Sequence, residues 1–82
     1  MTTLDEWVTA VCAELNLDPA QAEVPLILEL ARDVAHNVVR AGAPVTAYLL
    51  GLAVGQGVDL IDASARLTTL ADTWGEPVPP AP

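Results

Sequence analysis

One uncharged segment, residues 41–58, limits the folds open to this chain more than any other feature. Its sequence, AGAPVTAYLLGLAVGQGV, contains no Asp, Glu, Lys or Arg, although the whole chain has a formal net charge of −8. Pro44 suits the first turn of a helix, where a missing N–H costs nothing, and Gly57 suits a left-handed residue just after a helix. We expect a helix here that is buried at the centre of the protein, because a helix that is apolar on all sides is normally covered.

The same segment is too interrupted to cross a membrane. A transmembrane helix needs about 20 predominantly apolar residues, and Pro44, Thr46, Gln56 and several glycines break this one. No cluster of Lys or Arg flanks the segment to set an orientation, and the chain does not start with the basic residues and apolar core of a secretory signal. We therefore expect a soluble protein of the cytoplasm that does not contact membranes.

Length and charge narrow the range of partners. The 82 residues include eleven acidic side chains against three arginines, a balance that disfavours nucleic acids and anionic membranes because both attract basic surfaces.

We expect a single helical domain over residues 1–75 and a Pro-rich, disordered tail over residues 76–82. A domain this small has a thin stability margin, so self-association is a reasonable source of additional cover.

The order of the sequence signals predicts an all-α protein, a compact bundle of four main helices and one short turn. Thr3 with Glu6 has the spacing of a capping box, and Asp18 and Asp59 are further N-cap residues. The expected elements are a helix from Thr3 to Asn16, a short turn over Pro19–Ala22, a helix from Pro25 to about Arg40, the central third helix within residues 41–58, and a last helix from Asp59 that Gly75 stops.

The three outer helices carry apolar side chains at the spacing of one buried face. Cys12 belongs to the first of these faces and is expected to act as a small core hydrophobe rather than a reactive thiol. The side chains expected to be buried are Leu4, Trp7, Val8, Val11, Cys12 and Leu15 in the first helix, Ile27, Leu28, Leu30, Ala31, Val34, Ala35, Val38 and Val39 in the second, and Leu60, Ala63, Ser64, Leu67, Leu70, Ala71 and Trp74 in the last.

Small residues recur at every fourth position of the central helix, at Ala43, Ala47, Gly51 and Gly55. A glycine inside a helix costs about 1 kcal/mol relative to alanine, so this stripe indicates close approach by another helix. The neighbour is either a helix of the same chain or a second subunit of a homodimer, and the sequence leaves both open. The predicted helix-packing or dimer seam is Ala47, Gly51 and Gly55.

The second helix provides the candidate binding surface. Arg32, His36 and Arg40 follow one another at steps of four and so share one helical face, where guanidinium groups can hold a phosphate or a carboxylate. Asp33 belongs to the same surface, and with Glu29 it can neutralise much of the positive charge through ion pairs within the helix. This face therefore binds an anion, contacts a partner protein, or is a solvated, salt-bridged surface.

No catalytic or metal-binding pattern accompanies these residues. Asp33 and His36 have the spacing of a metal motif found in carboxylate di-iron bundles, but the chain has one histidine. The sequence contains no nucleophile with a supporting base, no phosphate-binding glycine loop and no dinucleotide fingerprint. We therefore expect neither an enzyme nor a metal site, and no cofactor.

Three stretches of the chain resemble a known family. They are Leu4-Asp5-Glu6-Trp7, Leu30-Ala31-Arg32-Asp33-Val34-Ala35-His36 with Arg40, and Ala43-Pro44 with Tyr48-Leu49-Leu50-Gly51. Together they are similar to a small actinobacterial helical domain of unknown function, which stands alone or follows a molybdenum cofactor guanylyltransferase in one chain. The resemblance extends from Leu4 to Trp74 and supplies no catalytic residues.

The resemblance implies an accessory role. It predicts a non-enzymatic interaction domain associated with molybdopterin guanine dinucleotide biosynthesis or with molybdoenzyme maturation, which uses the polar surface of the second helix as its contact. The implied partner is the guanylyltransferase or a maturation factor. The alternatives are a protein that binds an anion or a nucleotide cofactor on the same surface, and a structural homodimerisation module.

Overall fold

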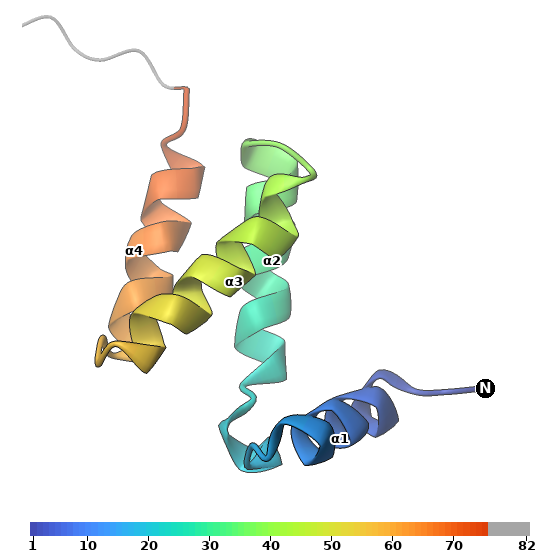
Figure 1. Ribbon diagram of the computed structural model, residues 1–82. Coiled ribbons are helices and arrows are strands. Elements are labelled where there is room, and N and C mark those ends of the chain that lie inside the picture. The colour runs from blue at the N-terminus through green and yellow to red at the C-terminus, as the bar shows by residue number, and fades with distance from the viewer. Residues whose placement is uncertain (76–82) are drawn as a thin grey trace, which may run out of the picture.

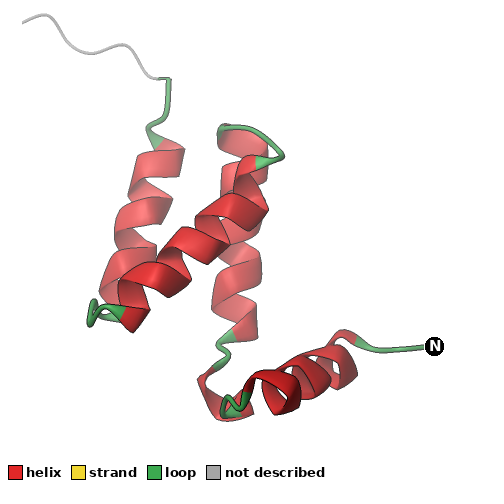
Figure 2. Cartoon of the chain, viewed as in Figure 1, coloured by secondary structure: helices red, strands yellow, loops and turns green. Residues whose placement is uncertain are grey.

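The computed structural model describes residues 1–75, and these residues form helices joined by short loops (Figure 2). The elements are α1 (Leu4–Leu15), the short 3-10 turn η1 (Pro19–Gln21), α2 (Val24–Asn37), α3 (Gly42–Gly55) and α4 (Leu60–Asp72). The predicted all-α bundle of four main helices and one short turn is confirmed. The tail predicted over residues 76–82 lies outside the described residues.

The starts of α1, η1 and α4 follow the predicted capping signals. Each predicted N-cap side chain accepts a hydrogen bond from an amide of the first turn, which has no partner within its own helix. These bonds run from the Glu6 amide to Oγ1 of Thr3 at 3.1 Å, from the Ala20 amide to Oδ1 of Asp18 at 3.0 Å, and from the Asp62 amide to Oδ2 of Asp59 at 2.9 Å.

Two of the helices end at a left-handed residue, a conformation that was predicted for Gly57, whereas Asn16 was predicted only to end the first helix. Asn16 follows α1 with φ 59°, and Gly57 lies just beyond α3 with φ 103°. In both places the next amide bonds back across five residues, which is the pattern of a Schellman motif. The two bonds join Leu17 to the carbonyl of Cys12 at 2.8 Å and Val58 to the carbonyl of Ala53 at 3.0 Å.

α2 differs from the prediction at both ends. It begins at Val24, one residue before Pro25, and it ends at Asn37 rather than near Arg40. The backbone leaves the helical region at Val38, where φ is −118° and ψ is −83°. The early end has a physical cause in the turn that follows.

Gly42, the first residue of α3, packs tightly against α2. A Cβ atom at Gly42 would lie 3.2 Å from Cγ1 of Val34. Because each further helical residue adds about 1.5 Å of rise, an α2 helix continued to Arg40 would carry the chain past this contact. The turn therefore requires α2 to stop before the position that its apolar pattern suggests.

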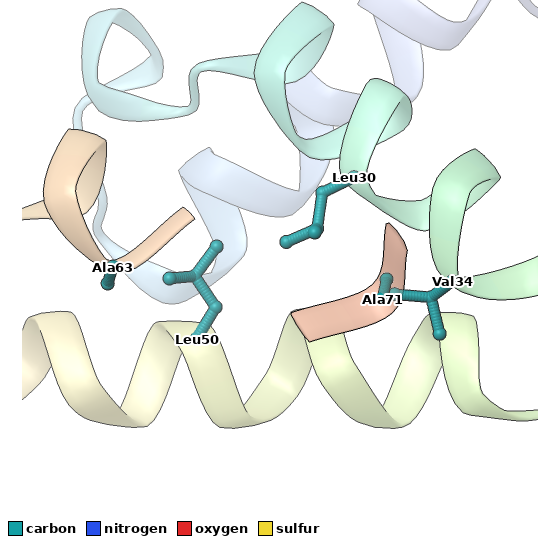
Figure 3. Packing of buried hydrophobic residues seen from close by; sticks show 5 residues of the cluster. All are labelled: Leu30, Val34, Leu50, Ala63 and Ala71. Atoms are coloured by element: carbon teal, nitrogen blue, oxygen red, sulfur yellow. The ribbon is translucent and has the colours of Figure 1, made fainter. Parts of the chain in front are cut away.

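The core lies between α2, α3 and α4, each of which packs against the other two (Figure 1). α3 thus contacts both neighbours, as expected of a central helix. Leu50 of α3 is the most deeply buried side chain, with 2% of its surface exposed. The buried cluster consists of Leu30, Val34, Leu50, Ala63 and Ala71 (Figure 3), with Ile27, Leu60 and Leu67 packed partly buried around it.

α1 stands apart from this three-helix core. Only η1 packs its backbone closely against α1, which points away from α3 and α4 in Figure 1. Cys12 is buried as predicted, and Val8 and Val11 are half-buried. Leu4, Trp7 and Leu15 are exposed, with 61% of Trp7 accessible. The predicted burial of these three side chains is wrong because no helix within residues 1–75 covers this part of α1.

The prediction that residues 41–58 are buried is also wrong. Leu50 is the one buried residue of α3, because α2 and α4 cover a single side of that helix. Tyr48 and Leu49 are 67% and 54% exposed. Other apolar side chains that were predicted to be buried and are exposed are Leu28, Val38, Val39, Leu70 and Trp74. No helix within residues 1–75 is both long enough and apolar enough to cross a bilayer.

Candidate functional site

The predicted surface residues Arg32, Asp33 and His36 lie on α2, outside the buried core. Arg32 and His36 are exposed and one helical turn apart, so they share the outer face of the helix. Asp33 is half-buried and lines a cavity of about 420 Å³ between α2 and α4, together with Ser64. The structure therefore brings Arg32 and His36 together and places Asp33 at the boundary with α4.

Arg40 does not share this helical face. α2 ends at Asn37, so Arg40 lies in the turn that leads into α3. Steps of four place side chains on one face only within a continuous helix. The prediction of one helical face for all three basic residues is therefore wrong for Arg40, which is exposed just beyond the end of α2.

The charges on α2 are not neutralised as expected. The salt bridge within residues 1–75 joins Arg66 to Asp62 at 3.8 Å, on the exposed side of α4. Arg32 forms no ion pair with any residue in this range, although Glu29 lies about one turn before it and Asp33 directly follows it. Its guanidinium group is therefore available to an anion or to a partner protein.

Sequence reasoning missed a polar contact beside this surface. Nδ2 of Asn37, next to His36, donates to Oδ1 of Asp72 at 3.1 Å and links the end of α2 to the end of α4. The two residues are 35 positions apart, so no pattern within one helix could reveal the contact. Asn37 thus positions the end of α2 relative to α4.

The two glycines in the small-residue stripe of α3 do not pack against another helix of the described chain. A Cβ atom at Gly51 or Gly55 would have no heavy atom of a neighbouring segment within 4 Å, and both residues are exposed. Ala47 is half-buried. The interpretation of Ala47, Gly51 and Gly55 as a seam between helices of one chain is therefore wrong for the two glycines.

Gly51 instead lines an open groove that the sequence analysis did not predict. This groove, which we call the α3 groove, has a volume of about 630 Å³ and lies between the α1–η1 end of the chain and α3. Its apolar lining includes Leu17, Ile27, Ala47, Gly51, Val54 and Leu60. The signal in the sequence that could have revealed the α3 groove is Gly51, because a glycine in the middle of a helix lowers the stability of that helix.

The described residues offer a limited set of groups to a ligand. No group of three or more His, Cys, Asp or Glu side chains in this range is arranged to hold a metal ion. Cys12 is a free, buried thiol, and each buried polar side-chain atom of residues 1–75 has a hydrogen-bond partner. The candidate binding features are the guanidinium groups of Arg32 and Arg40, the imidazole of His36, and the apolar α3 groove.

Comparison with protein families identifies the domain. Residues 1–79 match the family described as domain of unknown function DUF6457. The chain belongs to the DUF6457 family. The match includes every element from α1 to α4, so both the α2 surface and the α3 groove are parts of the DUF6457 domain. It agrees with the expected similarity to a small domain of unknown function. No curated protein and no solved structure matches the chain.

Proposed function

We propose that this DUF6457 domain is a non-enzymatic accessory protein of the cytoplasm that contacts a protein of molybdopterin guanine dinucleotide biosynthesis or molybdoenzyme maturation. The connection to the molybdenum cofactor rests on the resemblance of the three sequence stretches given above. The proposed partner is the guanylyltransferase that accompanies similar actinobacterial domains, and the proposed contact is the outer face of α2 with the turn that follows it.

The free guanidinium group of Arg32 is the observation that supports this contact surface. The protein carries a net charge of −8 with three arginines. Arg66 is paired with Asp62, whereas Arg32 and Arg40 are exposed near the end of α2 without ion pairs to residues 1–75. Exposed guanidinium groups without ion pairs can meet a carboxylate-bearing partner surface, because guanidinium groups bind carboxylates through paired hydrogen bonds.

Binding of the purified chain to the molybdenum cofactor guanylyltransferase of the same organism tests the proposal. Arg32→Ala and Arg40→Ala are each expected to weaken binding by about tenfold, which corresponds to about 1.4 kcal/mol. Arg66→Ala is the matched control, because it removes the same side chain from the exposed face of α4. Absence of binding by the unaltered chain, or an equal loss with Arg66→Ala, contradicts the proposal.

The same free guanidinium group favours one second candidate, a protein that binds a phosphate-bearing nucleotide with Arg32, His36 and Arg40. In that case GMP raises the melting temperature of the unaltered chain, because a ligand that binds only the folded state stabilises it. The shift is then lost in Arg32→Ala and kept in Arg66→Ala. Guanylyltransferase binding without a GMP shift favours the accessory role.

A further inference from the structure

We propose that two copies of this chain form a two-fold dimer in which the α1 stripe of each copy (Leu4, Trp7, Val8 and Val11) occupies the α3 groove of the other. This dimer uses the α1 stripe and α3 and does not involve Arg32, His36 or Arg40, so it is tested independently of the proposed function. The proposal rests on two uncovered apolar surfaces, on their shapes and charges, and on the total accessible area.

The first uncovered surface is α3. A helix that is apolar on all sides is normally covered by other helices, and α3 carries no charged residue. Yet Leu50 is its one buried residue, and the α3 groove leaves the bare side of Gly51 open. A groove floored by Ala47 and Gly51 has room for a bulky side chain from another helix.

The second surface is the α1 stripe, in which Leu4 and Trp7 are exposed and Val8 and Val11 are half-buried. It forms the wall of an open cavity of about 330 Å³ between α1 and the start of α2. This cavity and the α3 groove share Cys12, Ala22 and Ile27. The two cavities are therefore adjacent, so the α1 stripe and α3 line neighbouring hollows of the same side of the chain.

The accessible area of the chain exceeds that of a compact monomer. A folded protein of 8.5 kDa exposes about 4,700 Å², whereas this chain exposes 6476 Å². The seven residues beyond Gly75 account for at most about 1,100 Å² of the difference, since even an unfolded chain exposes about 160 Å² per residue. At least about 700 Å² of excess area remains on residues 1–75, close to the roughly 800 Å² that each partner contributes to a standard interface.

Charge and symmetry identify a second copy as the occupant. Two proteins of net charge −8 repel each other, and the repulsion is weakest where the contact surfaces carry no charge, because salt screens the more distant charges. The α1 stripe and α3 are both uncharged. Only Asp18 and Glu23 carry charge among the residues that line the α3 groove. α1 does not pack against α3 of its own chain, so a two-fold contact covers both surfaces in both copies at once.

Light scattering coupled to size-exclusion chromatography tests the dimer. The unaltered chain is expected to elute at about 17 kDa, twice its mass of 8.5 kDa. Trp7→Glu places a charge in the α1 stripe and Gly51→Leu fills the α3 groove, and each is expected to weaken the dimer by about 100-fold. Ala13→Glu is the matched control, because it adds the same charge on the opposite side of α1, and it leaves the dimer intact.

Circular dichroism separates loss of the dimer from loss of folding. Trp7 is already exposed, and a side chain at Gly51 meets no other segment of the chain within 4 Å at its Cβ. Both variants are therefore expected to keep the helical signal of the unaltered chain. A monomeric unaltered chain, or a dimer that survives both substitutions, overturns the proposal.

Mixing the two variants tests the reciprocal arrangement. A dimer of one Trp7→Glu copy and one Gly51→Leu copy retains one intact contact, between the unaltered α1 stripe and the unaltered α3 groove. Native mass spectrometry of the mixture is expected to show this heterodimer, although neither variant dimerises alone. If no heterodimer forms, α3 pairs with α3 or the α1 stripe with itself, and the exchanged arrangement is wrong.

Discussion

Gly42 and Val34 approach more closely than a side chain at position 42 normally permits. A Cβ atom at Gly42 would lie 3.2 Å from Cγ1 of Val34, and 3.3 Å from Cγ1 of the exposed Val39. Val39 can move into solvent, whereas Val34 is 5% exposed and held in the core. This contact joins the start of α3 to the side of α2 and so directs how α3 crosses the bundle.

We predict that Gly42→Ala destabilises the protein by about 1 kcal/mol, because overpacking a filled core site forces its neighbours out of place. Urea unfolding followed by circular dichroism measures the loss. Val34→Ala removes the opposing methyl groups, so Gly42→Ala is expected to cost less in that background, with a coupling of at least about 0.5 kcal/mol. Strictly additive losses would show that the close approach is not the cause.

Gly57→Ala is predicted to destabilise the protein through backbone strain alone. Gly57 has φ 103° and no heavy atom within 4 Å of a built Cβ, so the cost of about 1 kcal/mol arises from the left-handed conformation that L-residues avoid. Gly55→Ala is the matched control. It lies two residues earlier in the helical region with the same open surroundings, and alanine there is expected to stabilise α3 by up to about 1 kcal/mol. A neutral Gly57→Ala in thermal unfolding contradicts this account.

Helix boundaries were predictable from the sequence where the determinants are local. Thr3, Asp18 and Asp59 each bond to an amide two or three residues away, and Gly57 allows a bond across five residues. The two residues that form each of these bonds lie within five positions of each other, so a short stretch of sequence is enough to predict them. The end of α2 was mispredicted because it depends on Gly42, which lies beyond the helix and meets Val34 only after the chain has turned. Arg40 was placed on α2 for the same reason.

Burial was not predictable, because an apolar pattern shows which side of a helix avoids water and not which segment covers it. Trp7 and Tyr48 lie on apolar stripes at helical spacing, yet both are more than half exposed. Leu50, in the same uncharged segment as Tyr48, is fully enclosed. The difference arises from the docking of α2 and α4 on one side of α3, which no single-helix pattern encodes. That Arg32 and His36 share one exposed face of α2 was predictable, since both residues lie within one continuous helix and are four positions apart.

Leu50→Ala is predicted to cost about 2–5 kcal/mol, the range for a large side chain removed from a core that cannot collapse around the cavity. In a domain this small the loss approaches the total stability, so the melting transition falls sharply or disappears. Leu49→Ala provides the control, because Leu49 is the adjacent leucine of α3 and is 54% exposed. Its removal is expected to cost less than about 1 kcal/mol. Equal losses at the two positions in thermal unfolding would show that the core does not centre on Leu50.

The hydrogen bond from Asn37 to Asp72 is predicted to hold the end of α2 against α4. Asn37→Ala removes an exposed bond and is expected to cost about 0.5–1 kcal/mol. Asn37→Asp costs more, because two carboxylates then face each other, and the added cost shrinks as salt screens the repulsion.

Exchanging the two groups separates this contact from other effects of the substitution. In the double variant Asn37→Asp with Asp72→Asn, the amide at position 72 donates to the carboxylate at position 37, and the bond is restored with its charge moved across the interface. Urea unfolding at low and high salt should therefore rank the double variant above Asn37→Asp alone and remove its salt dependence. If Asp72→Asn fails to rescue Asn37→Asp, the two side chains do not interact in solution, and the end of α2 is held by its apolar contacts instead.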